Sequence, residues 1–251
     1  MSSAELAAWP YPRWVAHRGA GKLAPENTLA AFKLGASHGY RMFECDVKLS
    51  ADGVPFLLHD ATLERTTNGH GVAGDERWLT LSALDAGSWR APEFAGEPLP
   101  TFETIARYCL DHGHFLNIEI KPTPGAETQT GTVVADAAAA LWHGQATPPL
   151  LTSFKTASLR AAMAAQPDLP RGLLIDRLED FPDGWVAAAT ALACVAVVCN
   201  YRLWTAETVA EAKAAGFRTL SYTVNDEASA QRLIDLGTDG LITDRVDLFK
   251  P

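Results

Sequence analysis

The sequence contains little cysteine, and the spacing of its cysteines excludes two kinds of stabilised fold. Four cysteines occur among 251 residues, and they form no CxxC pair: Cys45, Cys109, Cys194 and Cys199. Structural zinc sites commonly use CxxC pairs, and disulfide frameworks are typical of short, cysteine-rich secreted chains. We therefore expect reduced thiols in the core of a cytosolic protein.

Long apolar runs are also missing. The longest apolar stretch extends from Trp185 to Cys199, is interrupted by Thr190 and is rich in alanine. It is shorter than the ~20 residues that cross a bilayer, so a short helix leading into a buried strand explains it better. The segment Met1 to Glu5 has neither the basic nor the hydrophobic part of a secretory signal. We expect a cytoplasmic protein with no membrane partner.

Positive charge is scarce as well. The chain has 21 Lys and Arg against 30 Asp and Glu, which gives a formal net charge of −9. An acidic protein is not expected to bind nucleic-acid phosphates or anionic membranes by general charge attraction. A ligand that carries phosphate would need local cations or a metal ion.

What the sequence does contain is a regular alternation of short apolar runs and helical periods. Eight runs are typical of parallel strands that are covered on both faces: 14–17, 41–48, 115–121, 150–154, 171–175, 194–199, 218–225 and 240–243. Seven segments between them have helical patterns: 28–38, 101–112, 128–142, 156–165, 185–192, 205–215 and 226–236. Because parallel neighbours need a crossover connection, this order predicts an α/β fold, a (β/α)8 TIM barrel.

One segment interrupts the alternation, from about residue 50 to residue 100. Near its start, the pair Asp52-Gly53 is typical of a tight turn and indicates a hairpin. The segment then becomes rich in Gly, Pro, Thr and Asn. Since it follows the second strand, it leaves the barrel at the face where such enzymes have their active sites. We expect a single barrel domain over residues 1–251 with this segment as a small insertion or lid. Trp78 and Trp89 could line the pocket or form the core of the insertion.

Charged residues lie two apart within two of the strand-like runs. Glu44 and Asp46 share one face of the second run, and Glu119 and Lys121 share one face of the third. We expect all four side chains to point into the barrel, where buried like charges are costly without a cation. Oxygen ligands of this kind suit one hard divalent ion, Mg²⁺ or Ca²⁺, with Mn²⁺ as an alternative, and do not suit zinc.

Two histidines map to the same end of the barrel. His17 and Arg18 follow the first strand, and His59 ends an apolar run in the insertion. A single histidine is weak support for catalysis, but two beside an arginine, a lysine and three carboxylates indicate an active site. Lys22 could contact phosphate or face water, and we favour water.

The motifs resemble, in order and over nearly the whole chain, those of the glycerophosphodiester phosphodiesterases. They are His17-Arg18-Gly19, Pro25-Glu26-Asn27-Thr28, Glu44-x-Asp46, His59-Asp60, Glu119-x-Lys121, Thr223-Val224-Asn225 and Gly240-Leu241-Ile242-Thr243-Asp244. The stretches 19–25 and 63–66 are most similar to the bacterial cytoplasmic branch, which is associated with glycerophosphodiester uptake.

The resemblance implies a role for each motif residue. It implies that Glu44, Asp46 and Glu119 bind one divalent metal and that His17 and His59 are the acid-base pair. By analogy with related barrel phospholipases, we assign His17 as the general base and His59 as the general acid. The order of these two roles and the first nucleophile stay open.

The resemblance also implies that Arg18 and Lys121 face the substrate phosphate. Many members have Trp where this chain has Tyr222, so we expect an aromatic wall there with altered contacts. The partner is a small glycerophosphodiester; the sequence also allows a homodimer.

The expected reaction is metal-dependent hydrolysis of glycerophosphodiesters, such as glycerophosphocholine or glycerophosphoethanolamine, to sn-glycerol 3-phosphate and an alcohol. Three alternatives stay open: a cyclising phospholipase of the lyase type, a lysophospholipase D and a non-catalytic barrel that binds phosphodiesters. The last would be expected to lose a titrating residue, yet all are present. The metal, the preferred head group and the oligomeric state are left undecided by the sequence.

Overall fold

Eight parallel strands close into a barrel in the computed structural model, which describes residues 8–251. The strands are β1 (Trp14–Ala16), β2 (Met42–Leu49), β4 (Phe115–Ile120), β5 (Leu150–Ser153), β6 (Arg171–Ile175), β7 (Ala196–Asn200), β8 (Arg218–Tyr222) and β9 (Gly240–Thr243). Pairing of β1 with β2, Ala16 opposite Phe43, closes the ring. The predicted TIM barrel is confirmed. The segment Met1 to Glu5, expected not to be a signal, lies outside the described residues.

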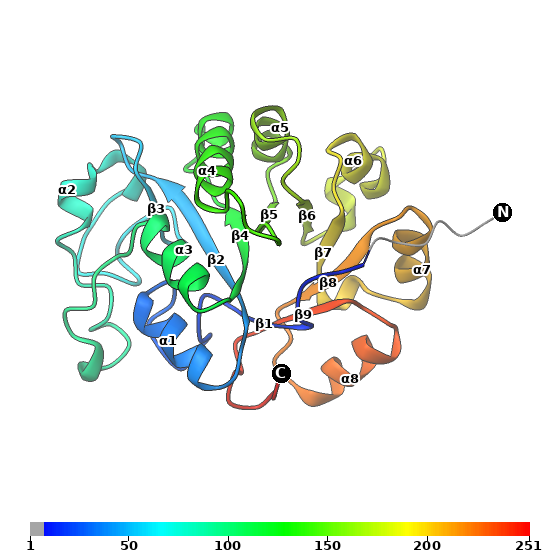
Figure 1. Cartoon of the computed structure of the whole chain (residues 1–251), viewed down its shortest axis with the longest axis horizontal. Coiled ribbons are helices and arrows are strands. Elements are labelled where there is room, and N and C mark those ends of the chain that lie inside the picture. Colours follow the sequence, from blue (N-terminus) through cyan, green and yellow to red (C-terminus); the bar gives the residue numbers. More distant parts are fainter. Residues whose placement is uncertain (1–7) are drawn as a thin grey trace.

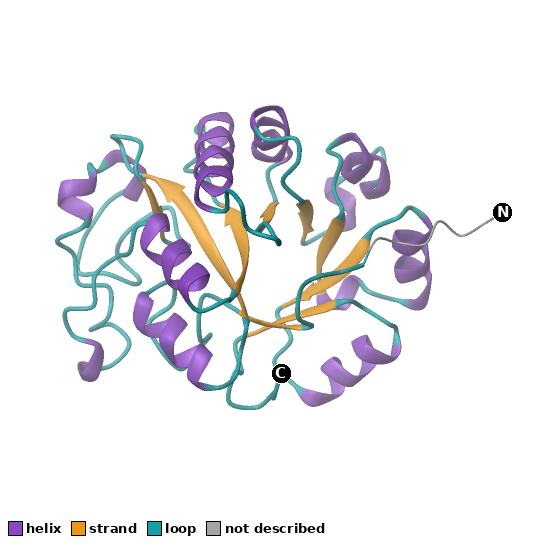
Figure 2. Cartoon of the chain, viewed as in Figure 1, coloured by secondary structure: helices purple, strands orange, loops and turns teal. Residues whose placement is uncertain are grey.

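Helices surround the strands, as the inner and outer rings of Figures 1 and 2 show. They are α1 (Leu29–Ser37), α3 (Phe102–Asp111), α4 (Glu127–Leu141), α5 (Thr156–Ala165), α6 (Trp185–Ala191), α7 (Ala206–Ala214) and α8 (Glu227–Asp235). Thr28, Thr101, Thr205 and Asp226 cap four of these helices by accepting a backbone N–H, each cap contributing ~1 kcal/mol. None of the helices within residues 8–251 is both long and apolar enough to span a bilayer.

Alternation along the strands divides the barrel interior into an apolar floor and a polar mouth. The floor draws residues from seven strands: Val15, Met42, Leu150, Leu174, Ala196, Val198, Leu220 and Ile242. Two residues further along, the same face presents His17 after Val15, Glu44 after Met42 and Tyr222 after Leu220. The strand period therefore carries the charged side chains to the carboxyl end of the barrel.

The chain leaves β8 earlier than the sequence pattern predicted, at Tyr222 instead of Asn225. The side chain of Asn225 instead binds the loop after β9: its amide donates to Asp244 Oδ2 (2.9 Å), and the Asp244 N–H donates to Asn225 Oδ1 (2.9 Å). These bonds tie the ends of β8 and β9 together where the ladder stops.

The segment after β2 folds back as the antiparallel strand β3 (Pro55–Leu57), with Leu49 opposite Pro55. This confirms the predicted hairpin. The rest of the insertion is irregular, with α2 (Trp78–Leu81) and the 3₁₀ turns η1 (Ala73–Asp75) and η2 (Pro92–Phe94). It lies beside the barrel (Figure 1). Its buried apolar side chains form a core of their own. Trp78 packs on Phe56 in that core, with ring centroids 5.9 Å apart. Two further 3₁₀ turns, η3 (Leu178–Asp180) and η4 (Tyr201–Leu203), follow β6 and β7.

All four cysteines are buried and unpaired. Burial raises the pKa of each thiol, most simply at Cys109 and Cys199, where it is the sole cause. They are core residues, as the sequence predicted.

Candidate active site

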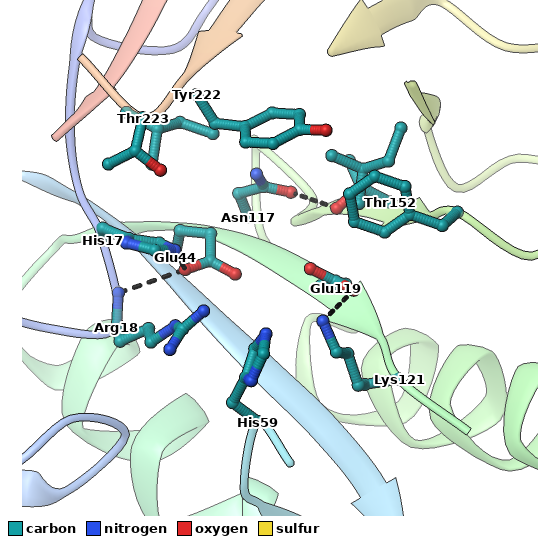
Figure 3. A pocket seen from close by; sticks show the side chains of 13 residues that line it. His17, Arg18, Glu44, His59, Asn117, Glu119, Lys121, Thr152, Tyr222 and Thr223 are labelled. Atoms are coloured by element: carbon teal, nitrogen blue, oxygen red, sulfur yellow. Dashed lines mark hydrogen bonds and ion pairs between the residues drawn. The ribbon is translucent and has the colours of Figure 1, made fainter. Parts of the chain in front are cut away.

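The mouth of the barrel contains a cavity of about 190 Å³ that gathers the residues selected from the sequence (Figure 3). Seven of the eight line it: His17, Arg18, Glu44, His59, Glu119, Lys121 and Tyr222. The eighth, Asp46, is 1% exposed and lies against this group, with its carboxylate 3.3 Å from Arg18 Nε and 3.5 Å from Lys121 Nζ. The structure thus brings all eight together.

Three buried carboxylates meet on β2 and β4. Glu44, Asp46 and Glu119 can each offer one oxygen within 4.8 Å of the others, and Asp46 is the direct cross-strand neighbour of Glu119. Burial, followed by repulsion from Asp46, raises the pKa of Glu119 to about 7, and burial and both neighbouring acids raise the pKa of Glu44 well above its usual range. Such a cluster fits a hard divalent cation, which would relieve the repulsion.

Two cations hold the central carboxylate ionised. Burial opposes ionisation of Asp46, but the charges of Arg18 and Lys121 outweigh it and lower the pKa of Asp46. Lys121 also lies 2.9 Å from Glu119. The guanidinium and the ammonium therefore lie directly beside the acidic cluster.

His17 is oriented by an aspartate that the sequence analysis quoted in a motif without assigning it a role. Its Nδ1 lies 2.6 Å from Asp244 Oδ1, while its Nε2 lies 3.7 Å from Glu44 Oε2. Although burial opposes ionisation of Asp244, hydrogen bonds from His17 and Asn225 lower its pKa to about 2. The carboxylate stays charged at neutral pH and fixes the ring, leaving Nε2 as the nitrogen available to substrate.

His59 has the same arrangement and lines the same cavity. Its Nδ1 lies 2.7 Å from Asp60 Oδ1. Burial lowers the pKa of His59, with the charges of Arg18 and Lys121 adding to the effect and Asp46 opposing it. Two imidazoles, each held at Nδ1 by an aspartate, therefore line the cavity beside the acidic cluster.

Arg65, which was not predicted as a site residue, connects Asp60, the partner of His59, with Glu26, the partner of Arg18. Its guanidinium donates to Asp60 through Nε (2.6 Å) and Nη2 (3.0 Å), and to Glu26 through Nη1 (2.8 Å) and Nη2 (2.7 Å). Glu26 in turn accepts from Arg18 Nη1 at 2.8 Å. A continuous chain of charged hydrogen bonds thus connects His59 to Arg18 through the insertion. In the sequence, the stretch 63–66 resembles the bacterial cytoplasmic branch, but this resemblance assigns no role to Arg65.

The backbone of the β1–α1 loop is also shaped for the site. Arg18 and Asn27 have positive φ values of 51° and 59°, which is uncommon for residues other than glycine. In this conformation the Arg18 N–H donates to Glu44 Oε2 at 3.1 Å. Asn27 donates to Asp46 Oδ2 at 2.8 Å and accepts from the Asp46 N–H at 3.1 Å. Strained loop residues therefore fix two of the three carboxylates.

Lys48 is a buried cation that the strand period could have identified, because it continues the inward face of Glu44 and Asp46. It is 1% exposed, and its ammonium donates to the backbone oxygen of Lys121 at 3.1 Å. Burial lowers its pKa to about 8. Lys48 thereby supports the end of β4 from which the Lys121 side chain extends.

The wall of the cavity away from the charges is largely apolar. Tyr222 donates its hydroxyl to the backbone oxygen of Ile175 at 3.0 Å, so the ring is what it presents to the cavity. Phe154 packs against it at right angles, 5.7 Å between centroids. Asn117 and Thr152, joined by a 3.0 Å hydrogen bond, supply the polar groups on this side (Figure 3).

A second cavity of about 560 Å³ adjoins the first and shares His17 and Arg18 with it. It lies between the β1–α1 loop and the insertion, and Trp89 forms part of its lining. Of the two tryptophans considered above, Trp89 therefore contacts this cavity, whereas Trp78 belongs to the core of the insertion.

Comparison with known proteins identifies relatives along almost the full chain. Residues 17–248 match the sequence model of the Glycerophosphoryl diester phosphodiesterase family. The glycerophosphodiester phosphodiesterase of Caldanaerobacter subterraneus subsp. tengcongensis is 32% identical over 234 residues, covering 92% of this chain and 93% of the relative. That of Bacillus subtilis (strain 168) is 29% identical, covering 94% and 84%. A phosphodiesterase of Oleispira antarctica, solved in complex with the product sn-glycerol-3-phosphate, superposes with a TM-score of 0.85 at 34% identity, covering 93% of each chain.

Proposed function

Because the chain belongs to the Glycerophosphoryl diester phosphodiesterase family, we propose that it hydrolyses glycerophosphodiesters to sn-glycerol 3-phosphate and a free alcohol. The observation that carries the proposal is the pairing of His17 with Asp244 and of His59 with Asp60 in one cavity with the acidic cluster. A non-catalytic binding barrel would have no use for two oriented imidazoles. The product bound in the Oleispira antarctica relative is the one proposed here.

Glu44, Asp46 and Glu119 would hold one divalent ion, Mg²⁺ or Ca²⁺, with Mn²⁺ as an alternative. When bound, the ion supplies positive charge that lowers the cost of bringing an anionic phosphodiester into the site. Arg18 and Lys121 bind the phosphate oxygens and stabilise the charge that develops on them during cleavage. Both cations already contact Asp46, so they are in place before substrate arrives.

The histidines move the protons. His17, with Nδ1 held by Asp244, accepts a proton from the attacking hydroxyl group or water at Nε2. His59, held by Asp60, donates a proton to the oxygen of the leaving alcohol. The two aspartates keep each ring in one orientation and stabilise its protonated form.

The two cavities divide the substrate. The smaller one, with the rings of Tyr222 and Phe154 and the amide of Asn117, takes the glycerol end. The larger one, lined partly by the insertion, takes the alcohol end, so residues 50–100 act as a lid on that side of a single-domain enzyme. We place this reaction in the cytoplasm and on small diesters, without a membrane or nucleic-acid partner; a homodimer would be compatible with it.

The test is turnover of glycerophosphocholine with Mg²⁺, followed by chelator and then by excess Mg²⁺. We expect sn-glycerol 3-phosphate and choline to form, to stop forming with chelator and to resume with the ion. Release of a cyclic phosphate as the final product would indicate a lyase instead. Phosphocholine as the product would contradict the proposed reaction.

A further inference from the structure

The second cavity is lined by more cations than carboxylates. Four cations line it, Arg18, Lys22, Arg65 and Arg90, against two carboxylates. This concentration occurs in a chain whose net charge is −9. Cations gathered in one cavity of an acidic protein indicate a site for an anion.

The two carboxylates of the cavity already accept hydrogen bonds from other groups. Glu26 accepts hydrogen bonds from Arg18 and Arg65, and Asp244 accepts from His17 and Asn225. No carboxylate of residues 8–251 lies within 4.0 Å of the charged nitrogens of the two remaining cations, Lys22 and Arg90. The charge of Lys22 acts on Asp244 only at longer range, so neither cation has a carboxylate of the described residues in direct contact that a ligand would have to displace.

Lys22 and Arg90 are also held at the cavity as a pair. Arg90 donates through Nε (2.9 Å) and Nη2 to the backbone oxygen of Lys22. The Lys22 N–H donates to the backbone oxygen of Asp244 at 3.1 Å. At Gly21, φ is +55° and a Cβ atom would come within 2.2 Å of the Asp244 backbone, so only glycine allows this approach. The loop that carries Lys22 is thus fixed against the loop that orients His17.

We propose that the second cavity is the subsite for the leaving alcohol and that Lys22 and Arg90 select alcohols that carry a carboxylate or phosphate group. The inference rests on the proposed function, because His17 and Arg18 form the boundary between the two cavities, at the phosphate. Trp89 offers an apolar wall, with its indole N–H already donated to the Ala86 oxygen at 2.8 Å. A head group whose only charge is positive would lie beside two unpaired cations and gain less.

The experiment compares two substrates that differ only by one carboxylate, glycerophosphoserine and glycerophosphoethanolamine. We expect the wild-type kcat/KM for the serine diester to be at least ~10-fold higher at low salt, which corresponds to ~1.4 kcal/mol. The preference should decrease as salt rises, since both side chains are exposed. In the double variant Lys22→Met/Arg90→Met, the ratio of the two kcat/KM values should approach one.

The control is Lys33→Met/Arg107→Met, which removes two charges from the outer helices α1 and α3. It should keep the wild-type ratio and its salt dependence. A wild-type ratio near one, or a ratio that persists in the Lys22/Arg90 variant, would overturn the inference while leaving the proposed function intact. If neither diester were cleaved to sn-glycerol 3-phosphate, the proposed function would fail and the inference with it.

Discussion

Replacing Arg65 with Met would remove the connection between His59 and Arg18 without touching either residue. Arg65 makes four charged hydrogen bonds, two to Asp60 and two to Glu26. The hydrogen bonds from Arg65 to Asp60 are the largest cause of the lowered pKa of Asp60. Without them, Asp60 and Glu26 can rotate, and the groups they hold lose their fixed positions.

The effect on activity should exceed the effect on stability. The Arg65 side chain is 43% exposed, so water screens its two ion pairs and each contributes at most ~1 kcal/mol to the free energy of unfolding. Misplacing a proton donor and a phosphate-binding group costs more, because small displacements of reacting groups can reduce rates ~10²-fold. We expect Arg65→Met to lose ~10- to 100-fold in kcat/KM but only about 1–2 kcal/mol of stability.

The assay is steady-state release of sn-glycerol 3-phosphate, together with urea unfolding of the same samples. Arg65→Lys keeps the charge but cannot make two bidentate contacts, so its activity should be intermediate. Added guanidinium ion, at concentrations too low to unfold the protein, should restore part of the activity of Arg65→Met. Arg107→Met removes a surface arginine paired with Glu103 and should change neither quantity. Activity of Arg65→Met within threefold of wild type would contradict the role of Arg65 in positioning His59 and Arg18.

Four further substitutions test the site. His17→Ala or His59→Ala should reduce kcat by ~10²–10⁴-fold while metal binding, measured by calorimetry, is retained; wild-type turnover in either variant would contradict the assigned roles. Because the pKa of Glu119 is raised to about 7 and that of Glu44 is also raised, Mn²⁺ affinity measured by calorimetry should increase from pH 5 to pH 8. Glu119→Gln should weaken that dependence and lose most of the affinity. The folded pKa of Asp244, about 2, lies below its ordinary value of 3.8, so its contribution of ~2 kcal/mol is present above pH 4 and lost as pH falls towards 2. Asp244→Asn should therefore flatten the stability profile in that range; an unchanged slope would argue against the bond to His17.

Sequence patterns predicted the barrel well because its determinants are local. Strand alternation placed Glu44, Asp46 and Glu119 on the inward face, and helix ends followed from capping residues and glycines. The same alternation could have identified Lys48, which continues that face.

The supporting groups could not be predicted in the same way, because their contacts join segments far apart in the chain. Asp244 reaches His17 across 227 positions, and Arg65 reaches Glu26 across 39. Their charges were visible in the sequence, but their partners were not. The end of β8 at Tyr222 had no local signal for the same reason, since the bonds that replace the ladder come from the loop after β9.

In the proposed reaction, a phosphorus–oxygen bond is broken and an oxygen atom from water is bonded to phosphorus. The most direct measurement is ³¹P NMR of glycerophosphoethanolamine turnover in water enriched in ¹⁸O, with Mg²⁺ present. We expect sn-glycerol 3-phosphate whose phosphate contains one ¹⁸O atom. Formation of unlabelled sn-glycerol 3-phosphate, or of phosphoethanolamine in its place, would contradict it.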